Sequence, residues 1–312
     1  MHVLMSSVRD EGPFLLEWAA HHLAMGFDRL VVASNDCTDG TDALLDALAA
    51  VAPLAHVRNV VPESEAPQHA GYGAIRAGGH LRGAEWLMTL DADELLVVHA
   101  GGGRVRDLTG LAGDADLISL HARTFAGHPG RWAPGPVAPR LTRALAAGHK
   151  ADTMLKSLAR DPARFGAFHN HSPVRFREGR PLRVMEGDGS RREVPREVPL
   201  WQALRSAPVR EGAHRLAQVN HYATRWADAY ALRRARGRGA VAAGGPERHT
   251  DSYWAERAVP GPEDLSALRH ADAVAALMAD LLRDPAVAAA QGACDAEWTR
   301  RCQAIGWRQD AE

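Results

Sequence analysis

The first 90 residues alternate short apolar stretches with segments of helical spacing, and this alternation limits the fold more than any other feature of the chain. Apolar runs at His2–Val8 and Arg29–Ser34 predict buried strands. Helical spacing predicts one helix that begins at Gly12 and ends before Gly26, and another over Thr41–Val51. Further strands are expected at 55–61 and 86–90, with a helix at 70–82. The alternation predicts an α/β fold with a mostly parallel central sheet flanked by helices.

The composition is that of a globular protein with almost no net charge. Of the 312 residues, 46% are apolar and 24% are charged, which allows a sizeable core and excludes a disordered, collagen-like or coiled-coil chain. The 37 basic residues nearly balance the 38 acidic ones, so the chain as a whole attracts neither nucleic acid nor an anionic membrane. Nucleic acid is therefore not an expected partner, and an anionic ligand has to be bound by a local cluster of positive charge.

Cysteine usage and hydropathy indicate where the protein resides. Cys37, Cys294 and Cys302 form an odd, sparse set without the spacing of a zinc site or a disulfide framework, which favours a reducing compartment. The N-terminal apolar stretch is too short for a signal peptide, and no apolar run is long enough to span a membrane. The expected location is cytoplasmic, with at most peripheral contact at the inner face of the membrane.

The pattern changes twice along the rest of the chain. Residues 101–215 are rich in Gly, Pro and Arg and give only one clear strand signal, at 116–121. After residue 222 the chain is mostly helical, with an apolar face over 263–283. We therefore expect one domain over 1–222 and a helical C-terminal extension over 223–312. The extension could pack on the first domain, contact a partner or touch a membrane.

An apolar strand that leads directly into acidic residues is the strongest chemical signal. The run 87–90 is followed by Asp91, Asp93 and Glu94, and carboxylates so close together repel one another unless a cation or strong donors neutralise them. Mg²⁺ or Mn²⁺ suits this role, because these ions prefer oxygen ligands and bind one or two carboxylates together with substrate phosphates. A solvated acidic turn is the alternative interpretation. Since ligands bind beyond the carboxyl ends of parallel strands, the turns after the other strands are candidate sites as well.

Several ordered motifs together resemble a known family. They are Val8-Arg9-Asp10-Glu11-Gly12-Pro13-Phe14, His21-His22, Gly26-Phe27-Asp28, Asn35-Asp36-Cys37-Thr38-Asp39-Gly40-Thr41 and Asp91-Ala92-Asp93-Glu94. In this order they look like the family 2 glycosyltransferases of the GT-A fold, and above all like a bacterial branch with an Asp-x-Asp-Glu motif. The likeness covers roughly the first 100 residues well and the segments 169–173 and 220–222 more loosely. It implies a GT-A fold and a metal-dependent hexosyltransferase that uses a nucleotide-sugar donor, with UDP expected, and a glycan or glycolipid acceptor, with inversion at the anomeric carbon.

The resemblance also implies roles for particular residues. It places the nucleotide sugar against Arg9, Glu11, Asn35, Asp36, Gln68, Asp91 and Lys156. In this interpretation Asp91 and Asp93 hold Mn²⁺ or Mg²⁺ on the diphosphate, and His171 is the third metal ligand, with His221 as the alternative. The first two strand ends hold the base and ribose, Gln68 contacts the sugar or ribose, and Lys156 reaches the diphosphate. Asn35 and Cys37 stand where the wider family often has Asp and Ser, which leaves the identity of the nucleotide open.

Two other classes of protein remain as alternatives. A sugar-phosphate nucleotidyltransferase also uses an α/β sheet with acidic metal ligands, but a Gly-rich basic loop is then expected after the first strand, and residues 6–11 do not form one. A non-catalytic carbohydrate- or nucleotide-binding protein of the same fold would be free to lose Asp91 and Asp93. The general base stays unassigned, with Glu94 and Asp152 considered. The Arg-rich segments 160–215 and 233–238 indicate either an acceptor or lipid-phosphate surface or a solvated face.

Overall fold

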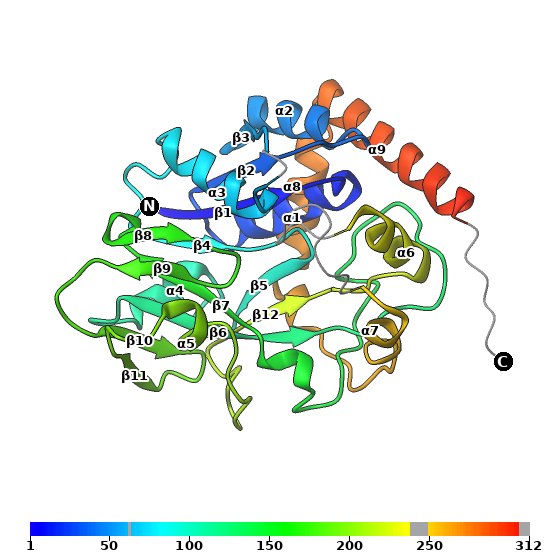
Figure 1. The fold of residues 1–312 in the computed structure, drawn as a ribbon. Coiled ribbons are helices and arrows are strands. Elements are labelled where there is room, and N and C mark those ends of the chain that lie inside the picture. Colours follow the sequence, from blue (N-terminus) through cyan, green and yellow to red (C-terminus); the bar gives the residue numbers. More distant parts are fainter. Residues whose placement is uncertain (62–63, 238–248, 306–312) are drawn as a thin grey trace.

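Four parallel strands form the N-terminal half of the central sheet in a computed structural model that describes residues 1–61, 64–237 and 249–305 (Figure 1). They are β1 (His2–Val8), β2 (Arg29–Ser34), β3 (Leu54–Arg58) and β4 (Trp86–Thr89), in the order β3-β2-β1-β4. Three helices connect them, namely α1 (Gly12–Ala24), α2 (Thr41–Val51) and α3 (Pro67–Ala77). Because these strands run parallel, the turns that follow β1, β2 and β4 meet at one edge of the sheet.

The second half of the sheet is mixed in direction. Its strands are β5 (Glu94–Val98), β6 (Leu117–Thr124), β7 (Leu155–Arg160), β10 (Leu182–Glu186), β11 (Arg191–Val194) and β12 (Ala217–His221). β7 lies antiparallel between β4 and β6, while β12 pairs parallel to β6 and antiparallel to β5. β8 (Phe165–Phe168) and β9 (Pro173–Phe176) form a separate two-stranded sheet. The last strand, β12, thus returns to the middle of the molecule, next to the acidic segment that begins β5.

The remaining helices surround this sheet. They are α4 (Val105–Gly110), α5 (Leu200–Ala203), α6 (Ala227–Arg236), α7 (Asp251–Ala255), α8 (Ala271–Leu281) and α9 (Pro285–Ala304), with 3-10 turns at Lys150–Thr153, Pro162–Arg164 and Ser266–His270. No helix in the described part of the chain is long and apolar enough to cross a membrane.

Each face of the sheet carries its own apolar core. Along β1, Leu4 points to the face covered by α1 and α2, whereas Val3 and Met5 point to the face covered by α3. All seven residues of β1 are buried, as expected for a parallel strand covered on both faces. The predicted α/β architecture of a central sheet flanked by helices is confirmed.

Several predicted boundaries are correct, and others move. β1, β2 and α2 have the predicted bounds, and α1 ends as expected, because Gly26 adopts a φ of 91° that lets the helix terminate. The predicted helix 70–82 is α3, which begins earlier, at Pro67, a residue suited to the first turn of a helix. The predicted strand 55–61 is the shorter β3. The segment 101–215, where one strand was expected, contains β6 to β11.

The C-terminal helices pack on the N-terminal part of the fold. α9 contacts α1 and α2, and α8 contacts α1; in Figure 1 α9 lies along α2. On α9, Trp298 Nε1 donates a hydrogen bond of 2.8 Å to Asp39 Oδ2, and the Trp298 ring packs edge-on against Phe14 at 5.0 Å. Asp39 also accepts hydrogen bonds from the backbone of Thr41, at 2.9 Å, and of Gly12, at 3.1 Å. This carboxylate therefore joins α9 to the starts of α1 and α2.

We expect Trp298→Phe to lower the free energy of unfolding by about 2 kcal/mol, because it removes a buried hydrogen bond to a charged acceptor while keeping most of the ring. Urea unfolding followed by circular dichroism measures the change. The matched control is Trp201→Phe at a side chain that is 47% exposed, where a change within about 0.5 kcal/mol is expected. Equal midpoints for the two variants would mean that the bond between Trp298 and Asp39 contributes nothing.

Candidate active site

A pocket lies where the turns after β1, β2 and β4 meet. The predicted site residues that line it are Arg9, Glu11, Asn35, Gln68, Asp91 and Asp93. Other lining residues were not predicted as donor-site residues, namely Asn170, Arg233, Arg236 and His249. Parallel strands place their carboxyl ends at one edge of a sheet, and residues from β1, β2 and β4 accordingly share this pocket.

The turns after β1 and β2 hold one another in a strained backbone conformation. Asp10 and Asp36 both have a φ of 48°, in the left-handed region of backbone conformation that residues other than glycine rarely adopt. The Asp10 carboxylate accepts a hydrogen bond of 2.6 Å from the backbone of Thr38 in the second turn. Asn35 is buried at the pocket wall, whereas Asp36 is exposed beside it and is not among the lining residues. Strain of this kind persists only where the surrounding contacts enforce it.

The carboxylate of Asp91 is fixed by two donors that were predicted site residues. Gln68 Nε2 donates to Asp91 Oδ1 at 2.7 Å, from the first turn of α3, and Lys156 Nζ donates to Asp91 Oδ2 at 3.1 Å. Gln68 therefore reaches the pocket because α3 begins at Pro67. Lys156, on β7, is fully buried and contacts Asp91 from the interior of the sheet; it is not among the residues that line the pocket.

Glu94 lies beneath Asp91 in the same buried network. Its Oε2 is 2.6 Å from Lys156 Nζ and accepts a hydrogen bond of 2.8 Å from the backbone of Asp91. Its Oε1 is buried and has no hydrogen-bond partner within the described residues. Burial raises the pKa of Glu94 to about 8, aided by the nearby charges of Asp91 and Asp93 and opposed by Lys156. The orphaned oxygen leaves this carboxyl able to accept one more donor or a cation.

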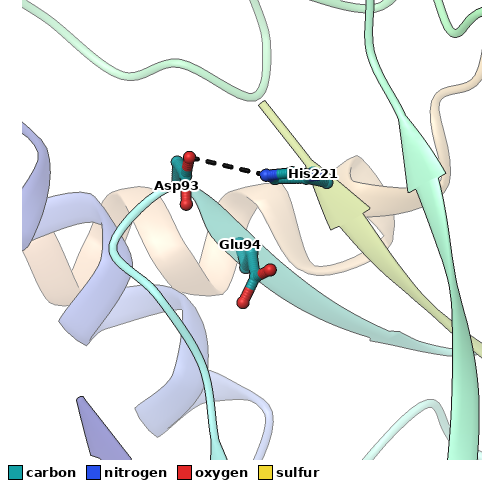
Figure 2. Close-up of side chains that lie close together, drawn as sticks. All are labelled: Asp93, Glu94 and His221. Atoms are coloured by element: carbon teal, nitrogen blue, oxygen red, sulfur yellow. Dashed lines mark ion pairs between the residues drawn. The ribbon is translucent and has the colours of Figure 1, made fainter. Parts of the chain in front are cut away.

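Asp93 and His221 face each other across the space between β5 and β12 (Figure 2). The His221 Nε2 atom is 3.5 Å from Asp93 Oδ2, and an Arg233 guanidinium NH group forms an ion pair with the same oxygen. Burial alone would raise the pKa of Asp93, but Arg233 and His221 hold it well below its usual range. Burial also lowers the pKa of His221, against the attraction of Asp93. Asp93 is therefore a carboxylate with cationic and hydrogen-bonding neighbours.

Asp93, Glu94 and His221 could hold a metal ion. One ligand atom from each lies within 4.8 Å of the others, and all three residues are buried. Two carboxylates and an imidazole are a donor set that suits Mn²⁺, and the orphaned Glu94 Oε1 shows coordinating capacity that the protein does not use. The residues therefore fit a divalent cation. Of the predicted ligands, Asp93 and the alternative, His221, belong to this group.

Asp91 and His171, the other two predicted metal ligands, are placed differently. The oxygens of Asp91 accept hydrogen bonds from Gln68 and Lys156. His171 Nδ1 lies 3.0 Å from the carbonyl oxygen of Leu155, and His171 is not part of the Asp93–Glu94–His221 group.

The sequence interpretation did not assign three arginines to the donor site: Arg233 and Arg236 line the pocket, and Arg225 lies behind Glu11 without lining it. Arg225 follows β12, with a φ of 49°; it donates to Glu11 Oε2 at 2.8 Å, and its guanidinium lies 3.5 Å from the centre of the Phe14 ring. Arg236 and Arg233 lie on α6, and Arg236 donates to Glu11 Oε1 at 2.8 Å. Despite burial, these arginines lower the pKa of Glu11. Both oxygens of Glu11, a predicted donor-binding residue, are thus engaged by the protein.

The basic run 233–238 was the available signal for two of these residues, and its sequence left open an acceptor or lipid-phosphate surface and a solvated face. Arg238 lies outside the described residues. Asp152, considered as a general base, accepts hydrogen bonds of 2.7 Å from the backbone of Thr124 and 3.0 Å from Arg123. It is buried and does not line the pocket.

Comparison with known proteins gives similarity at the level of solved structures. No protein-family model and no curated protein matches the chain. It is similar to S. aureus TarS 1–349 in complex with UDP, at 15% identity and a TM-score of 0.31, over 44% of this chain and 39% of that one. Another TarS 1–349 structure matches over 97% of this chain and 90% of that one, at 13% identity and a TM-score of 0.32.

A galactosyltransferase is also among the similar structures. LgtC in complex with donor and acceptor sugar analogs has 18% identity and a TM-score of 0.25, over 38% of this chain and 46% of that one. The chain thus spans less than half the length of the TarS complex with UDP and of LgtC. At these identities and TM-scores the similarity assigns no role to any residue of this chain.

Proposed function

We propose that this protein is a glycosyltransferase that moves a sugar from a nucleoside-diphosphate donor, with UDP expected, to a hydroxyl group of a glycan or glycolipid acceptor. The observation that carries the proposal is the pocket at the ends of β1, β2 and β4, which is lined by three arginines and by Asp93, a member of the group that could hold a cation. A nucleoside diphosphate has a polar base and ribose at one end and a strongly anionic diphosphate at the other. The pocket offers partners for both.

The turns after β1 and β2 supply the nucleoside part of the site. Asn35 has an amide that can donate and accept hydrogen bonds, as a nucleobase edge requires. Gln68 and Asp91, joined at 2.7 Å, present a further polar wall for the ribose or the sugar. The Asp10 carboxylate joins the two turns through its hydrogen bond from the backbone of Thr38, which keeps them in place before the ligand arrives.

The diphosphate end of the site combines Asp93, Glu94 and His221 with Arg9 and the arginines of α6. A divalent cation held by the first three would stabilise the negative charge that develops on the departing nucleoside diphosphate. Arg9 is exposed at the mouth of the pocket and can meet a phosphate oxygen without first losing a buried partner. Transfer with inversion requires a general base at the acceptor hydroxyl, and that residue stays unassigned.

A thermal-shift screen tests the proposal without knowledge of the acceptor. UDP, GDP, CDP and TDP are each added with Mn²⁺ or with EDTA to the wild type and to Asp93→Ala. A ligand that binds the folded state at 100 times its Kd adds about 2.7 kcal/mol of stability, so we expect one nucleotide to raise the Tm of the wild type only with Mn²⁺. Asp93→Ala is expected to abolish that rise.

The matched control is Asp272→Ala, at an exposed carboxylate on the first turn of α8, which should respond to nucleotide as the wild type does. A folded wild type whose Tm responds to none of the four nucleotides would refute the proposal. An equal response with EDTA would refute the metal assignment alone.

A further inference from the structure

Arg233 and the candidate cation site share one carboxylate, that of Asp93. The guanidinium of Arg233 forms its ion pair with Asp93 Oδ2, the oxygen that also faces His221. Asp93 belongs to the group that could hold a metal ion. Two cations next to one carboxylate oxygen repel each other strongly at a buried site, because the low local dielectric weakens screening. A divalent ion on Asp93 therefore requires Arg233 to move away.

The side chain of Arg233 can leave Asp93 and turn into the pocket. Its side chain is 23% exposed and lines the pocket. Besides Asp93 it donates only a 2.8 Å hydrogen bond to the carbonyl of Ala223 among its described contacts, and its Nε is buried with no partner in the described part of the chain. Another carboxylate whose charge acts on Arg233, that of Glu11, is already bound on both oxygens. Once displaced, Arg233 has a guanidinium free to bind an anion in the pocket.

The two neighbouring arginines are not placed to do this. Arg225 is held by Glu11, by the carbonyl of Ala92 at 2.8 Å and by the face of Phe14. Arg236 is held by Glu11 and by the backbone carbonyls of Arg9 and Asp10. The groups that bind Arg225 and Arg236 lie outside the candidate cation group, so a metal ion would not displace either arginine.

We infer that Arg233 alternates between two anionic partners: it holds Asp93 until a divalent cation replaces it there, and it then binds the diphosphate of the donor. This inference rests on the proposed function. A guanidinium matches phosphate oxygens with two parallel hydrogen bonds, so the displaced side chain gains in the complex what it loses at Asp93. The metal replaces Arg233 at Asp93 and so frees the guanidinium for the diphosphate. The diphosphate in turn binds Arg233 and so leaves Asp93 available to the metal. Metal and nucleotide then bind cooperatively.

The test measures binding rather than turnover. Mn²⁺ alone is titrated against each protein by electron paramagnetic resonance, and UDP, GDP, CDP and TDP are then titrated by calorimetry in the presence of Mn²⁺. Arg233→Met is expected to bind Mn²⁺ alone several-fold more tightly than the wild type. The same variant is expected to bind the nucleotide at least about tenfold more weakly, because it loses a hydrogen bond to a charged phosphate.

Arg233→Lys and Arg234→Met are the companion variants. Arg233→Lys keeps the charge without the forked geometry of the guanidinium. Its Mn²⁺ affinity should therefore stay near that of the wild type, and its nucleotide affinity should lie between those of the wild type and Arg233→Met. It also carries the test if Arg233→Met fails to fold. Arg234 is the adjacent arginine on α6, paired with the exposed Asp251, and Arg234→Met should bind both ligands as the wild type does.

The outcomes separate this inference from the proposed function. If the wild type binds Mn²⁺ and a nucleotide but Arg233→Met changes neither affinity, or weakens both, the exchange is wrong and the proposed function stands. If the wild type binds none of the four nucleotides, the proposed function fails and the exchange fails with it.

Discussion

Lys156→Met is expected to lower the free energy of unfolding by about 3–5 kcal/mol, the usual cost of removing one partner from a buried ion pair. Lys156 Nζ lies 3.1 Å from Asp91 and 2.6 Å from Glu94, and its side chain is fully buried. The methionine has nearly the same shape, so little packing is lost. The cost arises because the buried Glu94 and the partly buried Asp91 both lose their cation.

The pKa directions support this expectation. The neighbouring carboxylates raise the pKa of Lys156 although burial opposes the charge, so the lysine stays protonated in the folded protein. Replacing Glu94 as well removes one of the two acids that Lys156 neutralises. The double variant Lys156→Met/Glu94→Gln should therefore regain part of the lost stability, because a neutral amide cannot place a second negative charge beside Asp91.

The chain offers a matched control, because Lys150 is its only other lysine. Its side chain is 69% exposed and pairs with Glu256 at 2.8 Å, so Lys150→Met should change stability by less than about 1 kcal/mol. Urea unfolding at pH 7 measures all variants. If Lys156→Met and Lys150→Met unfold at the same urea concentration, the buried network does not hold the end of β4 in place.

Local patterns determined the part of the fold that the sequence could predict. The strands β1, β2 and β4 are short apolar runs with polar residues at their ends, and parallel pairing alone brings those ends together. That is why Asp91 and Asn35 could be placed at one pocket before any contact was known. By contrast, β7 and β12 pair with strands distant in sequence and partly antiparallel, and no local periodicity in the sequence indicates such pairing.

The choice between the two candidate histidines depended on that distant pairing. From the sequence, His171 was the predicted third metal ligand and His221 the alternative. β12 pairs antiparallel with β5 in a register that sets His221 opposite Glu94, which carries the imidazole to Asp93. His171 instead lies near the carbonyl of Leu155. Only the register of β12 distinguishes them, and a single sequence does not give it.

The arginines of the site could not be identified from the sequence because they too contact partners that are distant along the chain. Arg233 meets Asp93 across 140 residues of sequence, and Arg225 meets Glu11 across 214. An arginine-rich run on a helix is ordinarily a solvated face, and the composition of this chain makes such runs common. What distinguishes Arg233 is the buried acid that it faces, which is a property of the fold.

Asp116→Asn is expected to destabilise the protein by about 3 kcal/mol at neutral pH. Asp116 is buried between β6, β7 and β10 and accepts hydrogen bonds of 2.6 and 2.7 Å from Arg180 and 3.0 Å from the backbone of Arg183. Arg164 lies 2.9 Å from the same carboxylate. The amide keeps the shape but loses the charge that these groups share, and the arginines, being partly exposed, recover some hydration.

The effect should depend on pH in a defined direction. Burial alone would raise the pKa of Asp116, but hydrogen bonds and charges from Arg180, Arg183 and Arg164 lower it below its ordinary value of 3.8. A carboxylate with a lowered pKa contributes its full stability above that ordinary value and loses it as the pH falls through the pKa of the folded state. The wild type and Asp116→Asn should therefore differ most at pH 7 and converge below pH 3.8.

Asp114→Asn is the matched control for this second prediction. Asp114 lies two residues before Asp116 and also pairs with arginines, Arg183 and Arg191, but its side chain is 66% exposed. Urea unfolding at intervals from pH 7 to pH 3 should leave Asp114→Asn close to the wild type throughout. A loss in Asp116→Asn that stays constant down to pH 3 would assign the effect to packing and hydrogen-bond geometry instead of charge. In that case the arginines around Asp116 would be surface residues that happen to converge, and this edge of the sheet would owe its stability to the apolar side chains of β6 and β10.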